Sequence, residues 1–158
     1  MCNMWLDLNN QFAEAALQFR RDVHLNPNDA EEALWCVAAE ARTIGLQAAR
    51  SQMLVVGVDT RPHVQRCLEA FRAGEASLMQ SLLADQRPPD SAVYFYVEMY
   101  LALFAEASCE YDDLSLCNET LKHLSLALKT EYASKSSDYM VSVVRVWLDL
   151  RKQGHQDL

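Results

Sequence analysis

Hydrophobic residues recur every three or four positions along most of this chain, which is the spacing of one face of an α-helix. The clearest such stripe consists of Phe12, Ala15, Ala16, Phe19, Val23 and Leu25. Pro27 cannot continue a helix, so the pattern predicts a helix end at this residue. The next residues, Asn28 and Asp29, carry side-chain oxygens that can cap a second helix.

The same pattern predicts about eight helices along the whole chain. Gly45 and Gly74 stand where two of them end, because glycine tolerates positive φ angles. Residues 86–90 form the clearest loop, since Pro88 and Pro89 prevent a helical hydrogen-bond ladder. The expected helices cover residues 10–26, 29–43, 46–56, 63–73, 75–85, 92–108, 114–132 and 138–153.

Two segments depart from the amphipathic pattern. The valine-rich run at residues 55–58 could form a short strand, but no second strand is visible to pair with it, so we expect a helix end there. Residues 92–108 are apolar on nearly all sides, which indicates a helix with neighbours on several faces. We therefore expect a single all-α domain over residues 1–158, built from antiparallel helix hairpins as a stack or a compact bundle.

Composition narrows the class of partner. Hydrophobic residues make up 51% of the sequence, with only four glycines and four prolines, so the chain can bury a core and has few turns. The net charge of −8 disfavours nucleic acid and anionic membranes as partners. A basic or apolar partner suits this charge better, although solubility alone also explains it.

The five cysteines show no paired metal-binding spacing. We interpret them as reduced, buried side chains of an intracellular protein of the cytoplasm, and the lack of a visible secretory signal favours the same interpretation. The most apolar segment is too short to span a bilayer and contains Glu98. The sequence therefore predicts no membrane span.

No constellation of side chains predicts an enzyme. Cys109, Cys117 and His123 are the best metal candidates, but their spacing places them on different helix faces. His63 and Cys67 stand one helical turn apart, yet no third group is available to orient the imidazole. We therefore expect no catalytic residue, no cofactor and no metal.

The first stripe resembles the second helix of a tetratricopeptide repeat. In that family an aromatic residue is followed by a small residue three positions later, an aromatic four positions after that, and a proline eight further on, as in Phe12, Ala15, Phe19 and Pro27. A second repeat matches in part at Gly45, Leu46 and Ala49, while Trp35 falls off the usual tryptophan position. The resemblance implies a short right-handed superhelix of stacked hairpins.

The resemblance also implies a role. Tetratricopeptide proteins are scaffolds that hold a peptide or partner helix in a concave groove and have no chemistry of their own. One subset grips the C-terminal carboxylate of chaperones, but the corresponding positions near Glu31, Trp35 and Ala38 are acidic or apolar here. We therefore expect a protein–protein adaptor of another kind. The alternative is a structural subunit that associates with itself, for example as a homodimer.

Four residues are the best candidates for the partner-binding surface: Trp35, Arg42, Tyr96 and Tyr100. The two tyrosines are one helical turn apart, and in a groove their rings would hold an apolar side chain while their hydroxyls donate hydrogen bonds. The alternative is that both are core residues. A cluster of basic residues could likewise dock an acidic partner or form an ordinary solvated face; it consists of Arg61, Arg66, Arg72 and Arg87.

Overall fold

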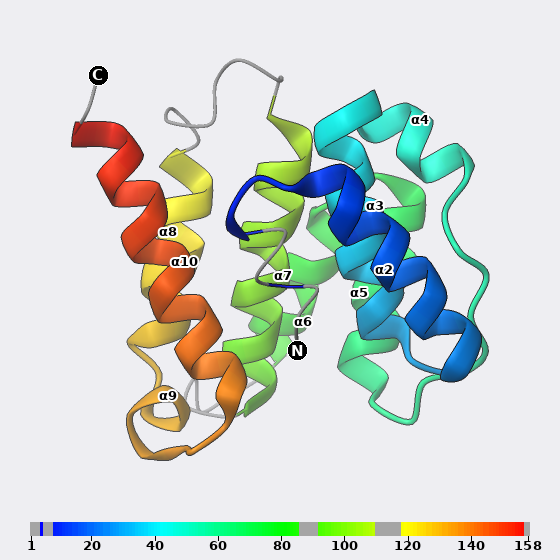
Figure 1. Cartoon of the computed structure of the whole chain (residues 1–158). Coiled ribbons are helices and arrows are strands. Elements are labelled where there is room, and N and C mark those ends of the chain that lie inside the picture. Colours follow the sequence, from blue (N-terminus) through cyan, green and yellow to red (C-terminus); the bar gives the residue numbers. More distant parts are fainter. Residues whose placement is uncertain (1–3, 5–7, 86–91, 110–117, 157–158) are drawn as a thin grey trace.

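The computed structural model describes residues 4, 8–85, 92–109 and 118–156. Every regular element in these residues is a helix, so the all-α prediction is confirmed. The helices, shown in Figure 1, are α2 (Phe12–Leu25), α3 (Ala30–Ile44), α4 (Leu46–Ser51), α5 (Pro62–Ala73), α6 (Ser77–Asp85), α7 (Ala92–Ser108), α8 (Asn118–Leu128), α9 (Glu131–Lys135) and α10 (Tyr139–Gln156). None of these described helices has both the length and the apolar character needed to cross a lipid bilayer.

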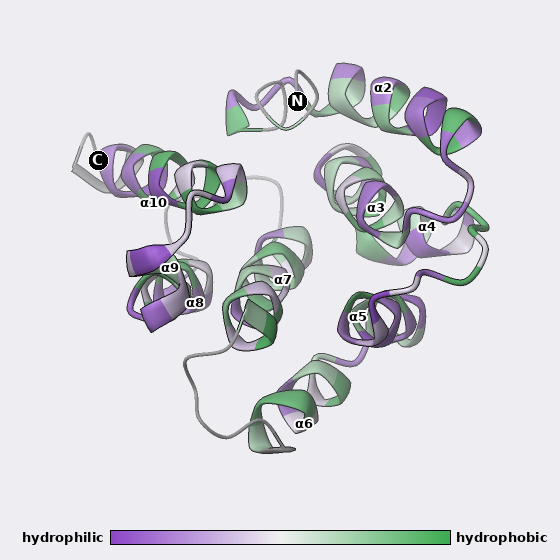
Figure 2. Ribbon diagram, turned by 90° about the horizontal axis from the view of Figure 1, so that it is seen from below, coloured by the Kyte–Doolittle hydropathy of each residue, from purple (hydrophilic) through white to green (hydrophobic). Residues whose placement is uncertain are grey.

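Helix α7 lies at the centre of the molecule. It packs against α3, α5 and α6 on one side and against α8 and α9 on the other, an arrangement visible end-on in Figure 2. Its buried residues point to both sides, as the sequence of residues 92–108 predicts. Removal of this apolar surface from water is the main favourable term in the folding of the chain.

The first stripe of the sequence faces α3. Five of its members are buried, namely Phe12, Ala15, Ala16, Phe19 and Val23, whereas Leu25, the last member of the predicted stripe, is 85% exposed. The small side chains of the two alanines let α3 come close, and the Cys36 thiol donates a hydrogen bond to the Ala16 carbonyl oxygen with the sulfur 3.7 Å away. Helices α2 and α3 therefore form a tightly packed pair.

Helix ends follow the predicted capping residues. Helix α2 ends two residues before Pro27. The Asp29 carboxylate accepts a hydrogen bond from the Glu31 N–H at 3.0 Å and so caps α3. Gly45 and Gly74 follow α3 and α5 with φ angles of 83° and 74°, which glycine adopts at low cost. These four boundaries were predictable because each depends on local chain chemistry.

Helix α4 is shorter than the sequence pattern predicts. It ends at Ser51, and residues 53–59 are not helical, so the expectation of a helix up to residue 56 is wrong. The Gly57 N–H instead donates a hydrogen bond to the Pro27 carbonyl oxygen at 2.7 Å. A side chain at Gly57 would collide with that of Asn28, so the glycine allows this segment to lie against the turn between α2 and α3.

The long helix expected at residues 114–132 is also interrupted. Helix α8 ends at Leu128 and α9 begins at Glu131. Between them, the Thr130 hydroxyl oxygen accepts a hydrogen bond from the Ala133 N–H at 3.2 Å, which is the geometry of an N-cap. The start of that expected helix and the loop at residues 86–90 lie outside the described residues.

Candidate functional site

The four predicted binding residues lie on the two central helices. Trp35 and Arg42 belong to α3, and Tyr96 and Tyr100 belong to α7. Trp35, Arg42 and Tyr100 are buried and Tyr96 is partly buried. Their side chains therefore make packing contacts in this structure, and their role in binding a partner stays a prediction.

Arg42 joins α3 to the C-terminal end of α7. Its Nη1 donates hydrogen bonds to the carbonyl oxygens of Glu106 at 3.1 Å and Cys109 at 3.0 Å. Its guanidinium carbon also lies 5.6 Å from the centre of the Phe12 ring, a cation–π contact. A positive charge at the C-terminus of a helix is favourable because it offsets the partial negative charge of the terminal carbonyl groups.

Tyr96 joins α7 to the turn before α10. Its hydroxyl donates a hydrogen bond to Asp138 Oδ2 at 2.6 Å, and the Tyr132 hydroxyl donates to the same oxygen at 2.7 Å. Burial acts to raise the pKa of Asp138, but these two hydroxyls and the Met140 N–H lower it below its ordinary value. Asp138 is therefore held as a carboxylate that connects α7, α9 and α10.

Trp35 stands between helices that are distant in the sequence. Its ring stacks on Phe19 of α2 at 6.4 Å between centroids and meets Trp147 of α10 at 5.6 Å. The Trp147 Nε1–H donates a hydrogen bond to Glu106 Oε2 at 2.8 Å. Trp35 thus connects the first hairpin of the chain to its last helix.

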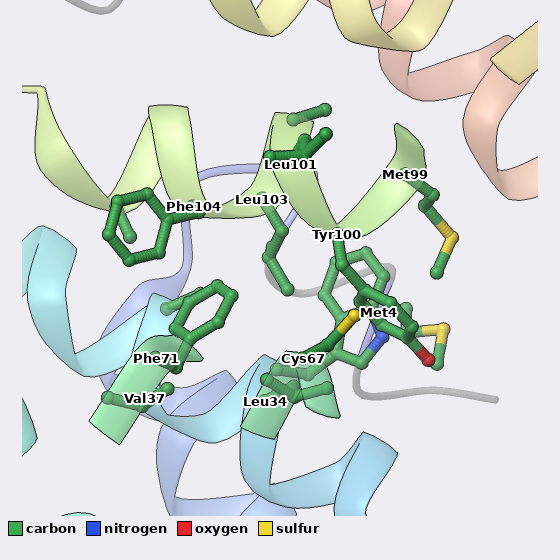
Figure 3. Packing of buried hydrophobic residues seen from close by; sticks show 14 of the residues in the cluster. Met4, Leu34, Val37, Cys67, Phe71, Met99, Tyr100, Leu101, Leu103 and Phe104 are labelled. Atoms are coloured by element: carbon green, nitrogen blue, oxygen red, sulfur yellow. The ribbon is translucent and has the colours of Figure 1, made fainter. Parts of the chain in front are cut away.

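The N-terminal residues that the structure describes lie between α10 and α2 (Figures 1 and 2). Met4 and Leu8 are 5% and 2% exposed and belong to the same hydrophobic cluster as Trp35, Tyr100 and Trp147. Figure 3 shows Met4 beside Tyr100. We call this contact region the α3–α10 seam and define it by these five residues.

Four buried polar atoms near the seam have no hydrogen-bond partner among the described residues. They are Glu31 Oε1, Glu32 Oε2, Trp35 Nε1 and the Tyr100 hydroxyl oxygen. The Tyr100 hydroxyl lies near enough to the Glu31 carboxylate for each to shift the other's pKa, but the two form no hydrogen bond of ordinary geometry. Such atoms are costly when they are left unpaired, so they are the places where a ligand, a partner or an ordered water gains most by binding. The sequence reading missed Glu31 and Glu32, because an acidic first turn is also an ordinary capping pattern.

The environment of these carboxylates disfavours their charge. Burial raises the pKa of Glu31 above its ordinary value even though Arg61 acts in the opposite direction. Burial also raises the pKa of Glu32 to about 7, and the charges of Asp22 and Asp29 act the same way. A donor or a cation placed beside these groups would therefore be bound favourably.

The arginines of the basic cluster mainly form ion pairs with acidic residues of the chain itself. Arg61 forms ion pairs with Asp29 at 2.9 Å, Glu31 at 2.9 Å and Asp59 at 2.8 Å. Arg66 pairs with Glu69 at 3.2 Å. These contacts favour the interpretation of a solvated, internally paired face over that of a docking patch, and Arg87 lies outside the described residues.

The cysteines differ in oxidation state. Cys36 and Cys67 are free and buried, and burial raises the pKa of both thiols, that of Cys36 to about 12. Cys109 is disulfide-bonded, so the prediction that all cysteines are reduced is wrong at this position. No group of three metal-ligating side chains occurs among the described residues, and Cys117, one of the metal candidates, lies outside them.

Comparison with known proteins gives no relative. No protein-family model, no curated protein and no solved structure matches this chain.

Proposed function

We propose that this chain is a non-enzymatic interaction module that binds a partner helix or peptide at the α3–α10 seam. The observation that carries the proposal is the burial of Met4 and Leu8 in this seam. Both residues have helical backbone conformation, and their separation of four positions is the spacing of one helical turn. A partner helix with apolar residues at the same spacing would make the same contacts.

The polar atoms of the seam add specificity to this proposal. An apolar side chain next to a basic one suits the region best, since Glu31 and Glu32 carry unpaired oxygens and the chain has a net charge of −8. Complementary charge chiefly raises the rate of association and excludes wrong partners. The preferred partner is therefore a basic amphipathic helix.

The proposal includes a tetratricopeptide-like stack as its architecture. Support comes from α2, where Phe12, Ala15 and Phe19 of the family-like stripe are buried. Further support is the packing of α5 against both α3 and α6, which continues the neighbour-to-neighbour order of a helical repeat.

A competition experiment tests the binding site. The probe is a fluorescein-labelled peptide of residues 1–11 with Cys2→Ser, which is titrated against the full chain and against the double variant Met4→Glu, Leu8→Glu. The variant should vacate the seam and bind the peptide at least tenfold more tightly than the wild-type chain, because the native segment competes at high effective concentration.

The matched control is Leu25→Glu, which introduces the same charge at a side chain that is 85% exposed. It should leave the anisotropy titration at the wild-type value. Circular dichroism establishes that each variant is folded. Equal and weak binding by the wild-type chain and the folded double variant would contradict the proposed site.

A second function, self-association, is favoured by a different observation. The most exposed large hydrophobic side chains among the described residues are Leu25, Val55 and Val58, at 85%, 89% and 79%. They belong to α2 and to the non-helical segment that lies against its C-terminal turn. Light scattering measures the molecular mass in solution and tests this function. A dimer that Val55→Asp converts into a monomer would support it, and a monomeric wild-type chain would exclude it.

A further inference from the structure

A three-residue hinge joins the buried residues Met4 and Leu8 to α2. It consists of Asn9, Asn10 and Gln11, whose side chains are exposed. Asn10 has a φ angle of 61°, in the left-handed region that asparagine adopts more easily than most residues with a side chain. Among the described residues other than glycine, it alone has a positive φ angle. The chain therefore passes from the seam into α2 through a backbone conformation that is disfavoured for most residues.

The surface that receives Met4 and Leu8 is separate from this hinge. The two side chains are 5% and 2% exposed and belong to one cluster with Trp35 of α3, Tyr100 of α7 and Trp147 of α10. Met4 lies beside Tyr100 (Figure 3). None of the three receiving residues belongs to the hinge or to α2. An identical segment from a second copy of the chain can therefore make the same contacts.

The length of the hinge determines which surfaces two such copies would bring together. Three hinge residues let Leu8 and Phe12 stand up to about 13 Å apart when the backbone is extended. Two copies joined by extended hinges would therefore place the first turns of their α2 helices close together. Ala13 and Leu17, one helical turn apart there, are exposed, and Leu17 is 52% exposed. This apolar surface would be covered by the second copy.

We propose that the segment up to Leu8 exchanges between two copies of the chain, which gives a dimer in which Met4 and Leu8 of each copy occupy the α3–α10 seam of the other. The inference rests on the seam of the proposed function and names a second copy of this chain as one occupant. Because the seam contacts of the monomer recur in the dimer, the hinge and the protein concentration determine the balance between them. Self-association through Val55 would leave each segment in its own seam.

Substitutions at Asn10 test the exchange. Each chain is unfolded in urea and refolded at high protein concentration with a reducing agent, so that no disulfide joins the copies. An ionic strength of about 0.15 M screens the repulsion between two chains of net charge −8. Light scattering then measures the molecular mass over a dilution series.

The wild-type chain should form dimers that Val55→Asp leaves intact. Asn10→Val should lower the dimer dissociation constant at least tenfold, because a β-branched residue strongly disfavours the left-handed conformation of the closed hinge. Asn10→Gly is the matched control and should raise the constant, because glycine adopts this conformation readily. Monomeric wild-type and Asn10→Val chains, or one dissociation constant for both Asn10 variants, would overturn the proposal.

A nuclear Overhauser experiment on the wild-type dimer identifies the exchanged segment without any substitution. One copy carries ¹³C-methyl methionine and ring-deuterated tyrosine, the other is unlabelled, and the two are refolded together. A contact between the labelled Met4 methyl and a Tyr100 ring proton then comes only from a second copy. Copies that are refolded separately at low concentration and mixed just before the measurement are the control and should lack this contact. Its absence in the co-refolded dimer would overturn the exchange.

The peptide of residues 1–11 with Cys2→Ser distinguishes this inference from the proposed function. Refolding of the wild-type chain in an excess of the peptide should give monomers, because the peptide occupies both seams. A peptide that binds the Met4→Glu, Leu8→Glu variant tightly, together with wild-type and Asn10→Val chains that stay monomeric, would overturn the exchange and leave the seam as a binding site. A dimer that persists in excess peptide would also overturn the exchange.

Discussion

Two buried carboxylates of this chain differ in how many of their oxygens accept hydrogen bonds. Glu106 of α7 is 6% exposed and accepts three hydrogen bonds, one from Trp147 Nε1 and two from the Arg151 guanidinium. Glu31 of α3 is 8% exposed, and one of its oxygens has no partner among the described residues. Both groups lose hydration on burial; Glu106 is compensated by three hydrogen bonds, whereas Glu31 is compensated only in part, by its ion pair with Arg61 at 2.9 Å.

Under the proposed function, this difference distinguishes a structural carboxylate from one that would contact a partner. Glu106 fixes α10 onto α7 and leaves no oxygen for a ligand. Glu31 stands with Glu32, Trp35 and Tyr100, each of which has an unpaired buried atom. A partner that supplies these hydrogen bonds would gain affinity from atoms that the described residues leave unsatisfied.

The largest effect is expected when Glu106 loses its main partner. Arg151→Ala leaves a buried carboxylate without its cation and should destabilise the chain by about 3–5 kcal/mol. Urea unfolding followed by circular dichroism measures the change. Arg66→Ala, which removes an exposed ion pair with Glu69, is the matched control and should cost less than about 1 kcal/mol. Similar values for both variants would mean that Glu106 is not the fully paired group described above.

A smaller loss is expected at the seam. Leu8→Ala removes a side chain that is 2% exposed and should destabilise the chain by about 2–3 kcal/mol, the range of large-to-small substitutions in a core. Leu25→Ala, at an 85% exposed position, should change the free energy of unfolding by less than about 0.5 kcal/mol. If both substitutions were equally mild, Leu8 would not be a packed residue of the seam.

The pH dependence of stability sharpens the comparison further. The pKa of Glu32 is raised from 4.5 to about 7 in the folded chain, so the folded state holds a proton that the unfolded state has already lost. Stability should therefore fall as pH rises from about 4.5 to about 7. The Glu32→Gln variant should lose about 1 kcal/mol less stability than the wild-type chain over this pH range, after allowance for solvent screening.

Urea unfolding at pH 4.5 and pH 8 measures this change. Glu14→Gln, at an exposed position of α2, is the control and should keep the wild-type pH dependence. A Glu32→Gln variant that loses as much stability with rising pH as the wild-type chain would show that Glu32 titrates normally.

The smallest effect is expected at Tyr100. Its hydroxyl lies near the Glu31 carboxylate but forms no hydrogen bond of ordinary geometry with a described residue, so Tyr100→Phe should change the free energy of unfolding by less than about 0.5 kcal/mol. Tyr96→Phe is the matched control, because it removes the hydrogen bond to Asp138 at 2.6 Å and should cost about 1–2 kcal/mol. A large loss at Tyr100 would reveal a partner for its hydroxyl and remove it from the unpaired group.

The helices were predictable where local chemistry decides them. The apolar stripe of α2, the stop before Pro27 and the positive φ angles of Gly45 and Gly74 follow from single residues and their neighbours. The helices expected at residues 46–56 and 114–132 were predicted too long, one because of a tertiary contact and the other because of a helix cap. The Gly57 hydrogen bond to Pro27 joins segments far apart in the chain, and Thr130 caps a helix inside a run that reads as continuous.

The candidate site was less predictable than the helices. Trp35 and Arg42 were visible as unusual residues of one helix, but their contacts with Trp147 and Glu106 come from more than 60 positions away. The burial of Met4 and Leu8 depends on how α2, α7 and α10 are placed. No periodicity within one segment contains that information.

The most direct test of the account is the environment of the Met4 methyl group in solution. If Met4 occupies the seam, its ¹³C-labelled methyl should show a ring-current shift and nuclear Overhauser contacts with Tyr100. Addition of an excess of the peptide of residues 1–11 with Cys2→Ser should move this resonance towards the value of an exposed methionine, as the peptide displaces the native segment. A Met4 methyl that has the exposed value before any peptide is added would contradict the account.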